Sequence, residues 1–111
     1  MHTDLLKNAE EFLASGDDNL KKKRFNAAVA DFFKAIAILC DYLIYEEMKI
    51  KPKNHSDRFS LLRKYFSDIY QETSGIFKVY TMSYNLRLSE KDAEKLRDYA
   101  YGLKNRIFNK K

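Results

Sequence analysis

The residues with the clearest capacity for chemistry surround one histidine in the segment KIKPKNHSDRFSLLRKYF. His55 follows the only proline of the chain and stands at an expected helix start, among many Lys and Arg residues. Helix-start N–H groups, the positive end of the helix dipole and side-chain cations together favour a bound phosphate. We therefore take as a candidate anion or nucleic-acid site Lys49, Lys51, Lys53, His55, Arg58 and Arg63. The alternative is that His55 packs or caps locally while the lysines are solvated.

His55 is also the candidate catalytic residue, because a neutral imidazole can act as a general base. The sequence identifies no partner for it. The chain has no Gly-rich phosphate loop, no Gly-x-Ser-x-Gly, no HExxH and no metal-ligand cluster in its sequence. We expect no metal and no cofactor.

Tyrosines and phenylalanines number eight each, too many for all the tyrosines to lie in a core. Tyr80, Tyr84 and Arg87 form a polar-tipped stripe at helical spacing, and we take them as candidates for lining a groove. Ordinary packing is the alternative. Exposed tyrosines also suit a dimer interface, a protein-binding surface or, less specifically, base stacking.

Composition bounds the class of protein. A chain of 111 residues is long enough for one core, so we expect a single domain over residues 1–111. The formal charge of +5 is compatible with an acidic partner such as a nucleotide or RNA. The basic run at 21–24 either complements the end of a helix dipole or binds phosphate. The start of the chain lacks the apolar run of a signal peptide, so we expect a cytoplasmic protein with no membrane association.

The longest apolar stretch, residues 25–48, predicts the central helix. Its apolar residues follow a period of 3.6 and cover more than half of the helix circumference, so other helices must cover it on several sides. Asp31, Lys34 and Asp41 interrupt it too often for a membrane span. Cys40 lies inside it and is expected to be a buried thiol.

The remaining elements are also helical. Residues 4–23 predict one helix that continues through Gly16, with the glycine on the buried stripe; the rival interpretation breaks this helix at residues 15–18. Asn26 is expected to cap the central helix, and Asn54, with Asp57 three residues later, to cap the third. That helix is expected to bend or break near residues 67–68, and a fourth to cover about residues 71–86. Ser89 is expected to cap a last helix with the buried seam Ala93, Leu96, Ala100, Leu103 and Ile107.

Three glycines and one proline disfavour a fold of many short strands. The short connections favour antiparallel neighbours. The sequence therefore predicts an all-α, up-and-down antiparallel bundle of four to five helices.

The order of these segments resembles the HEPN domain family. The likeness rests on FNAAVADFFKAIAILCDYLIY, a Lys-rich loop into NHSDRFSLLRKYF, and the later YTMSYNLRLSEKDAEKL, and it covers nearly the whole chain. The chain is similar to the compact archaeal and bacterial members of this family. The resemblance implies a helical bundle, a homodimer, and a small nucleotidyltransferase as partner, in some members as a toxin–antitoxin pair.

Other HEPN members are RNases that carry an arginine four to six residues before the histidine. Residues 45–54 of this chain contain no arginine, so the resemblance implies a nucleotide or nucleic-acid role without an RNase motif. Lysine lacks the planar fork that binds phosphate bidentately. Two alternatives stay open: a divergent metal-independent RNase using His55, and a protein-binding module with no nucleic-acid role. A single tetratricopeptide-like segment near residues 20–35 has no second copy and predicts no repeat fold.

Overall fold

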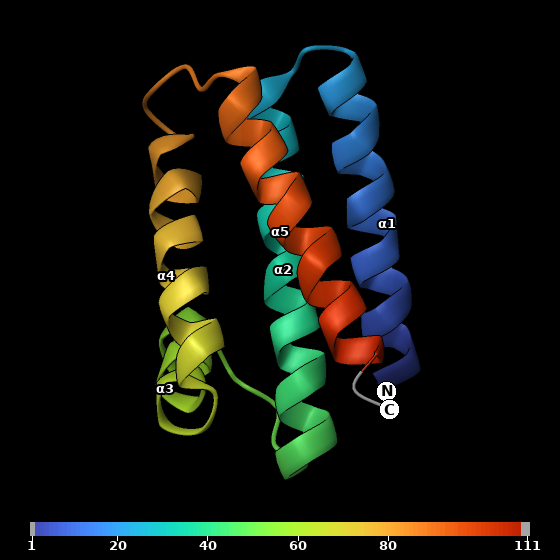
Figure 1. The fold of residues 1–111 in the computed structure, drawn as a ribbon, viewed down its shortest axis with the longest axis vertical. Helices are drawn as coiled ribbons and strands as arrows, with labels where there is room; N and C mark the ends of the chain where they lie inside the picture. Colours follow the sequence, from blue (N-terminus) through green and yellow to red (C-terminus); the bar gives the residue numbers. More distant parts are fainter. Residues whose placement is uncertain (1, 110–111) are drawn as a thin grey trace.

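The computed structural model describes residues 2–109, and this part of the chain forms helices and loops without a strand. The helices are α1 (His2–Lys21), α2 (Phe25–Met48), α3 (His55–Tyr65), α4 (Ser67–Met82) and α5 (Glu90–Phe108). Figure 1 shows α1, α2 and α5 side by side, with α4 on the other side of α2 and α3 seen end-on at the lower end of α4. The predicted all-α bundle is confirmed.

Helix α2 is the centre of the core, as its apolar pattern predicts. More than half of its residues are buried, because α1 and α5 cover one side and the α3–α4 pair covers another. Cys40 is fully buried, and burial raises the pKa of its thiol to about 12, so this side chain is unreactive at neutral pH. Among the described residues, no helix is long and apolar enough to cross a membrane.

Helix α1 runs unbroken through Gly16, so the continuous helix is confirmed and the break at residues 15–18 is not formed. Gly16 is buried against α2. A Cβ atom added to Gly16 would lie 2.6 Å from Cε1 of Phe32, whose ring is fully buried. The glycine therefore permits the close approach of α1 to α2.

Helix α5 confirms both its predicted cap and its seam. The Ser89 hydroxyl accepts from the Asp92 N–H at 3.2 Å, and the Asp92 carboxylate accepts from the Ser89 N–H at 3.0 Å. The five seam residues are all buried. A local capping box and a clean apolar period were sufficient to predict this helix.

The predicted break after the third helix is confirmed, but the fourth helix begins and ends earlier than predicted. The chain leaves the helical region at Phe66 (φ −141°, ψ 61°), and α4 begins at Ser67 and ends at Met82, four residues earlier at both ends than expected. Apolar residues continue at steps of three and four through this break, because both helices turn an apolar side toward α2. The apolar spacing alone therefore does not show where the chain changes direction between α3 and α4.

The predicted cap at Asn26 is wrong. The N-cap of α2 is Arg24, two residues before Asn26, and its side chain makes no capping hydrogen bond. The amide of Asn26 instead binds the loop between α4 and α5. Its Nδ2 donates to the carbonyls of Ser83 (2.8 Å) and Leu86 (2.7 Å), and its Oδ1 accepts from the Leu88 N–H (2.9 Å).

Candidate functional site

The start of α3 confirms the predicted cap at Asn54, but Asp57 does not complete a capping box. Asn54 caps the helix by accepting from the Asp57 N–H at 2.8 Å. The Asp57 carboxylate accepts from the N–H of Lys53 at 2.9 Å, one residue before the position that a capping box uses. These two contacts fix the end of the 49–54 loop, and with it the place of His55 at the first turn.

A charged pair beneath His55 was not predicted. Arg58 donates from Nε and Nη2 to the two carboxylate oxygens of Asp41, at 2.7 and 3.0 Å, and each side chain is only 12% exposed. This bidentate pair joins α3 to α2. The sequence did carry a signal, since Asp41 is an acid inside the most apolar stretch of the chain.

Arg58 also determines how His55 is protonated. Its Nη1 lies 2.6 Å from Nδ1 of His55. A guanidinium only donates hydrogen bonds, so Nδ1 must accept, and the neutral imidazole then carries its proton on Nε2. Burial chiefly, and then the charge of Arg58, lower the pKa of His55, while Asp41 opposes them. The ring at neutral pH is therefore an uncharged hydrogen-bond donor.

His55 belongs to a continuous series of aromatic rings that we call the aromatic ladder, formed by His55, Phe33, Tyr80 and Tyr84. The centroids of His55 and Phe33 are 5.8 Å apart, and Phe33 and Tyr80 stack at 4.5 Å with 12° between their planes. Tyr80 and Tyr84 follow at 5.6 Å, with their hydroxyls 2.8 Å apart. The His55 site and the tyrosine stripe, separate in the sequence, thus lie along one path across α2 and α4.

Two further contacts determine the chemical properties of His55 and Tyr80 in the aromatic ladder. Phe77 packs against the His55 ring at 5.5 Å, so the imidazole rests on aromatic side chains as well as on Arg58. The hydrogen bond between the Tyr80 and Tyr84 hydroxyls, together with burial, raises the pKa of Tyr80 to about 12. The Tyr80 phenol is therefore neutral at physiological pH and acts as a hydrogen-bonding group.

The other predicted cations are spread over this region. Lys49, Lys51 and Lys53 are exposed on the loop before α3, and Lys49 Nζ lies 5.5 Å above the Tyr45 ring. Arg63 is exposed eight residues after His55, about 12 Å further along the helix axis. Arg87 is exposed in the α4–α5 loop. The structure therefore brings His55 and Arg58 together and places the three lysines on the loop that leads into α3, whereas Arg63 lies further along the helix.

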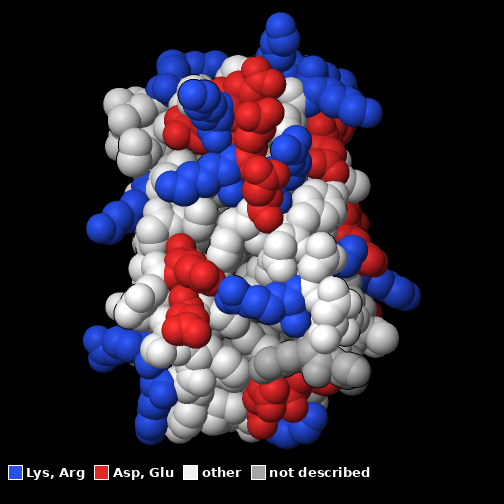
Figure 2. Space-filling model, in the orientation of Figure 1, with Lys and Arg blue, Asp and Glu red and all other residues white. Residues whose placement is uncertain are grey.

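The basic run at 21–24 stands among acids. Lys22 pairs with Asp18 at 2.9 Å. Lys21 and Lys23 line a depression that they share with Asp17, Glu90, Glu94 and Arg97. Figure 2 shows Lys and Arg side chains interleaved with Asp and Glu at the end of the bundle where the α1–α2 turn and the start of α5 lie. This arrangement favours local charge balance over phosphate binding.

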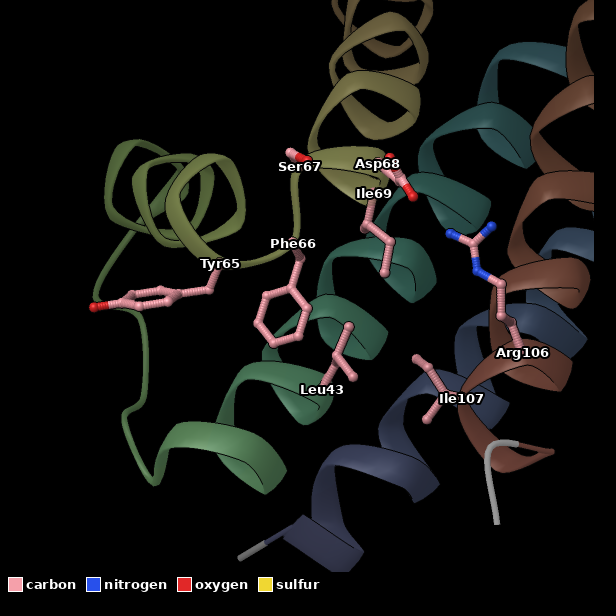
Figure 3. A pocket seen from close by; sticks show the side chains of 8 residues that line it. All are labelled: Leu43, Tyr65, Phe66, Ser67, Asp68, Ile69, Arg106 and Ile107. Atoms are coloured by element: carbon pink, nitrogen blue, oxygen red, sulfur yellow. The ribbon is translucent and has the colours of Figure 1, made fainter.

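A separate pocket of about 400 Å³ lies between the start of α4 and the ends of α2 and α5. Figure 3 shows Phe66, Ile69 and Ile107 pointing into it, with the guanidinium of Arg106 directed toward Asp68 at its rim. Arg106 is already paired with Glu72 at 2.9 Å. No residue of the predicted site lines this pocket.

The lowered pKa of His55 predicts how stability depends on pH. Because the folded pKa lies below the ordinary value of 6.5, protonation favours the unfolded chain. The stabilising contribution of neutral His55 is thus present above about pH 6.5 and is lost as the pH falls through the folded pKa. Between about pH 7.5 and pH 5, the wild-type unfolding temperature should fall further than that of His55→Asn, whose amide oxygen can still accept from Arg58. Thermal unfolding followed by circular dichroism measures both; parallel profiles would contradict the prediction.

Comparisons of the chain with protein-family models, curated proteins and solved structures returned no match. The fold and the candidate site together describe a small helical bundle. In it, the hydrogen-bonded residues His55, Arg58 and Asp41 lie at one end of the aromatic ladder. Within residues 2–109, no group of three or more His, Cys, Asp or Glu side chains is placed to hold a metal ion.

Proposed function

We propose that the chain is a HEPN-like accessory module that binds a nucleotide or RNA on the face that carries His55. The observation that carries this proposal is the hydrogen bond from Arg58 to Nδ1, which leaves Nε2–H as the donor of an exposed imidazole ring with a fixed tautomer. Three exposed lysines on the adjoining loop supply positive charge. A neutral hydrogen-bond donor at the end of a loop that carries exposed lysines suits a phosphate oxygen.

A divergent RNase is the second candidate, and one observation favours it: Arg58 places a guanidinium beside His55, although residues 45–54 contain no arginine. The same contact weakens a general-base role, because the nitrogen that lacks a proton is the one that Arg58 occupies. Binding therefore ranks above cleavage. The test is to incubate metal-free wild-type protein and His55→Ala with RNA. Cleavage by the wild type but not by the variant would rank RNase activity above binding.

The HEPN resemblance extends the proposal to a cytoplasmic homodimer that works with a small nucleotidyltransferase, as in some toxin–antitoxin pairs. Light scattering of the purified chain measures its oligomeric state. Co-expression with a nucleotidyltransferase encoded beside it tests the partner.

We expect the triple variant Lys49→Ala, Lys51→Ala, Lys53→Ala to bind RNA more weakly than the wild type. Each phosphate contact on a single strand contributes about 0.7 to the slope of log affinity against log salt, so the slope should fall in magnitude by about 2 if all three lysines contact phosphates. Fluorescence anisotropy of a labelled 12-nucleotide RNA, at several salt concentrations, measures this.

The matched control is Lys21→Ala, Lys22→Ala, Lys23→Ala, which removes the same charge from a region that contains its own acids. We expect a smaller change in slope for this control. Equal changes for the two triple variants would show that only net charge matters, and an unchanged slope for the first would remove the proposed site.

A further inference from the structure

The loop between α4 and α5 is held rigidly although it is exposed. Asn26 uses both amide hydrogens and its oxygen on this loop, at 2.7 to 2.9 Å. The Ser83 hydroxyl donates to the carbonyl of Tyr80 at 2.6 Å, and Leu88 is buried at the far end. The backbone of residues 83–88 is therefore fixed at its beginning, middle and end.

This loop presents Tyr84, which is 73% exposed, the most exposed of the large apolar side chains among the described residues. Its hydroxyl is bound to that of Tyr80, and the two rings are nearly perpendicular at 71°. Tyr80 in turn stacks on the buried ring of Phe33. In a perpendicular pair Tyr80 covers at most one face of the Tyr84 ring, so the other face stays open to solvent.

The composition of the loop that carries Tyr84 favours an anionic ligand. Residues 80–89 contain no Asp or Glu, and Arg87 is exposed three residues further along the loop. The aromatic ladder connects this ring with the His55 site. A flat, open ring with an arginine in the same loop is a suitable surface for stacking an unpaired base.

We propose that residues 83–88 form a stacking platform for an unpaired base of the bound RNA. Tyr84 provides the ring, Arg87 contacts a neighbouring phosphate, and Asn26 is a positioning residue that holds the loop. This inference rests on the proposed function, since the strand that reaches Tyr84 is the one bound beside His55. It adds a place where a base, rather than a phosphate, is recognised.

The test uses 12-nucleotide single-stranded RNAs in which 2-aminopurine replaces one base at successive positions. With the wild type, fluorescence should be quenched at a limited set of positions. Tyr84→Ala should abolish this quenching and weaken binding by about 5- to 100-fold, the range found when a stacking aromatic is removed. Tyr84→Phe keeps the ring and should retain most of both effects. Asn26→Ala should reduce the quenching while lowering the magnitude of the salt slope by no more than about 0.7, the share of the single Arg87 contact, a result that general destabilisation would not give.

Two further variants separate the alternatives. Tyr65→Ala removes another exposed tyrosine, 46% exposed and away from the loop, and should change neither readout. Leu86→Ser removes an apolar side chain, 53% exposed, from the same loop and should also change neither. Equal losses for Leu86→Ser and Tyr84→Ala would overturn the stacking platform and identify an apolar protein-docking surface instead.

The two proposals fail in different ways. If Tyr84→Ala binds RNA like the wild type while the triple lysine variant binds weakly, the platform is wrong and the proposed function stands. If the wild type binds none of the RNAs, both are wrong.

Discussion

Asp41→Ala is expected to lower the free energy of unfolding by about 3 kcal/mol, because it leaves the guanidinium of Arg58 largely buried without its partner. Both side chains are 12% exposed, and the carboxylate accepts two of the hydrogen bonds from Arg58. Removing one member of such a pair costs far more than the pair contributes, since the remaining charge keeps its desolvation penalty. Urea unfolding at neutral pH, analysed for both midpoint and slope, measures this loss.

The control is an exposed pair with the same chemistry. Asp18 and Lys22 are paired at 2.9 Å but are 59% and 53% exposed, so Asp18→Ala should change stability by less than about 0.5 kcal/mol. The double variant Asp41→Leu, Arg58→Met removes both charges and should recover most of the loss. A loss at Asp41 no larger than that at Asp18 would show that solvent screens the pair more than its burial indicates.

The same pair links the core to the candidate site. Asp41 holds two donors of Arg58, and a third is directed at Nδ1 of His55. Without Asp41 the guanidinium is free to turn, and the tautomer of His55 is no longer imposed. The proposed hydrogen-bond donor to phosphate, Nε2–H of His55, therefore depends on Asp41, a residue of the central helix.

Structural features that depend on residues close together in the sequence were predicted correctly. The caps at Asn54 and Ser89 depend on residues three positions apart, and the α5 seam depends on one apolar period. The continuity of α1 through Gly16 followed from apolar spacing that does not change at the glycine. In each case the information lies within one or two helical turns.

Features that need two distant segments were not predicted. Asn26 has the residue type of a cap, but its partners lie 57 to 62 residues away, and nothing near it in the sequence indicates them. The joining of His55 with Tyr80 depends on Phe33, a core residue on another helix. Only Asp41 gave a local hint, because a carboxylate in an apolar stretch requires a partner.

Gly16→Ala is expected to destabilise the protein by about 2 kcal/mol, although alanine is the better helix former by about 1 kcal/mol. The added methyl group would lie 2.6 to 2.8 Å from three atoms of the Phe32 ring. That ring is fully buried, so it can move only by displacing other core residues. The steric cost therefore exceeds the gain in helix propensity, and urea unfolding should give a lower midpoint.

Two other helical glycines provide controls of opposite sign. Gly75 in α4 and Gly102 in α5 are exposed, and an added Cβ atom meets nothing within 4 Å at either position. Alanine there should raise stability by about 0.5 to 1 kcal/mol, through helix propensity alone. In a Phe32→Leu background, Gly16→Ala should destabilise the protein less, because the smaller leucine side chain leaves more room for the added methyl group. A gain at Gly16 equal to the gains at the other two glycines would mean that α1 and α2 can separate freely, and would remove the close approach as a determinant of the fold.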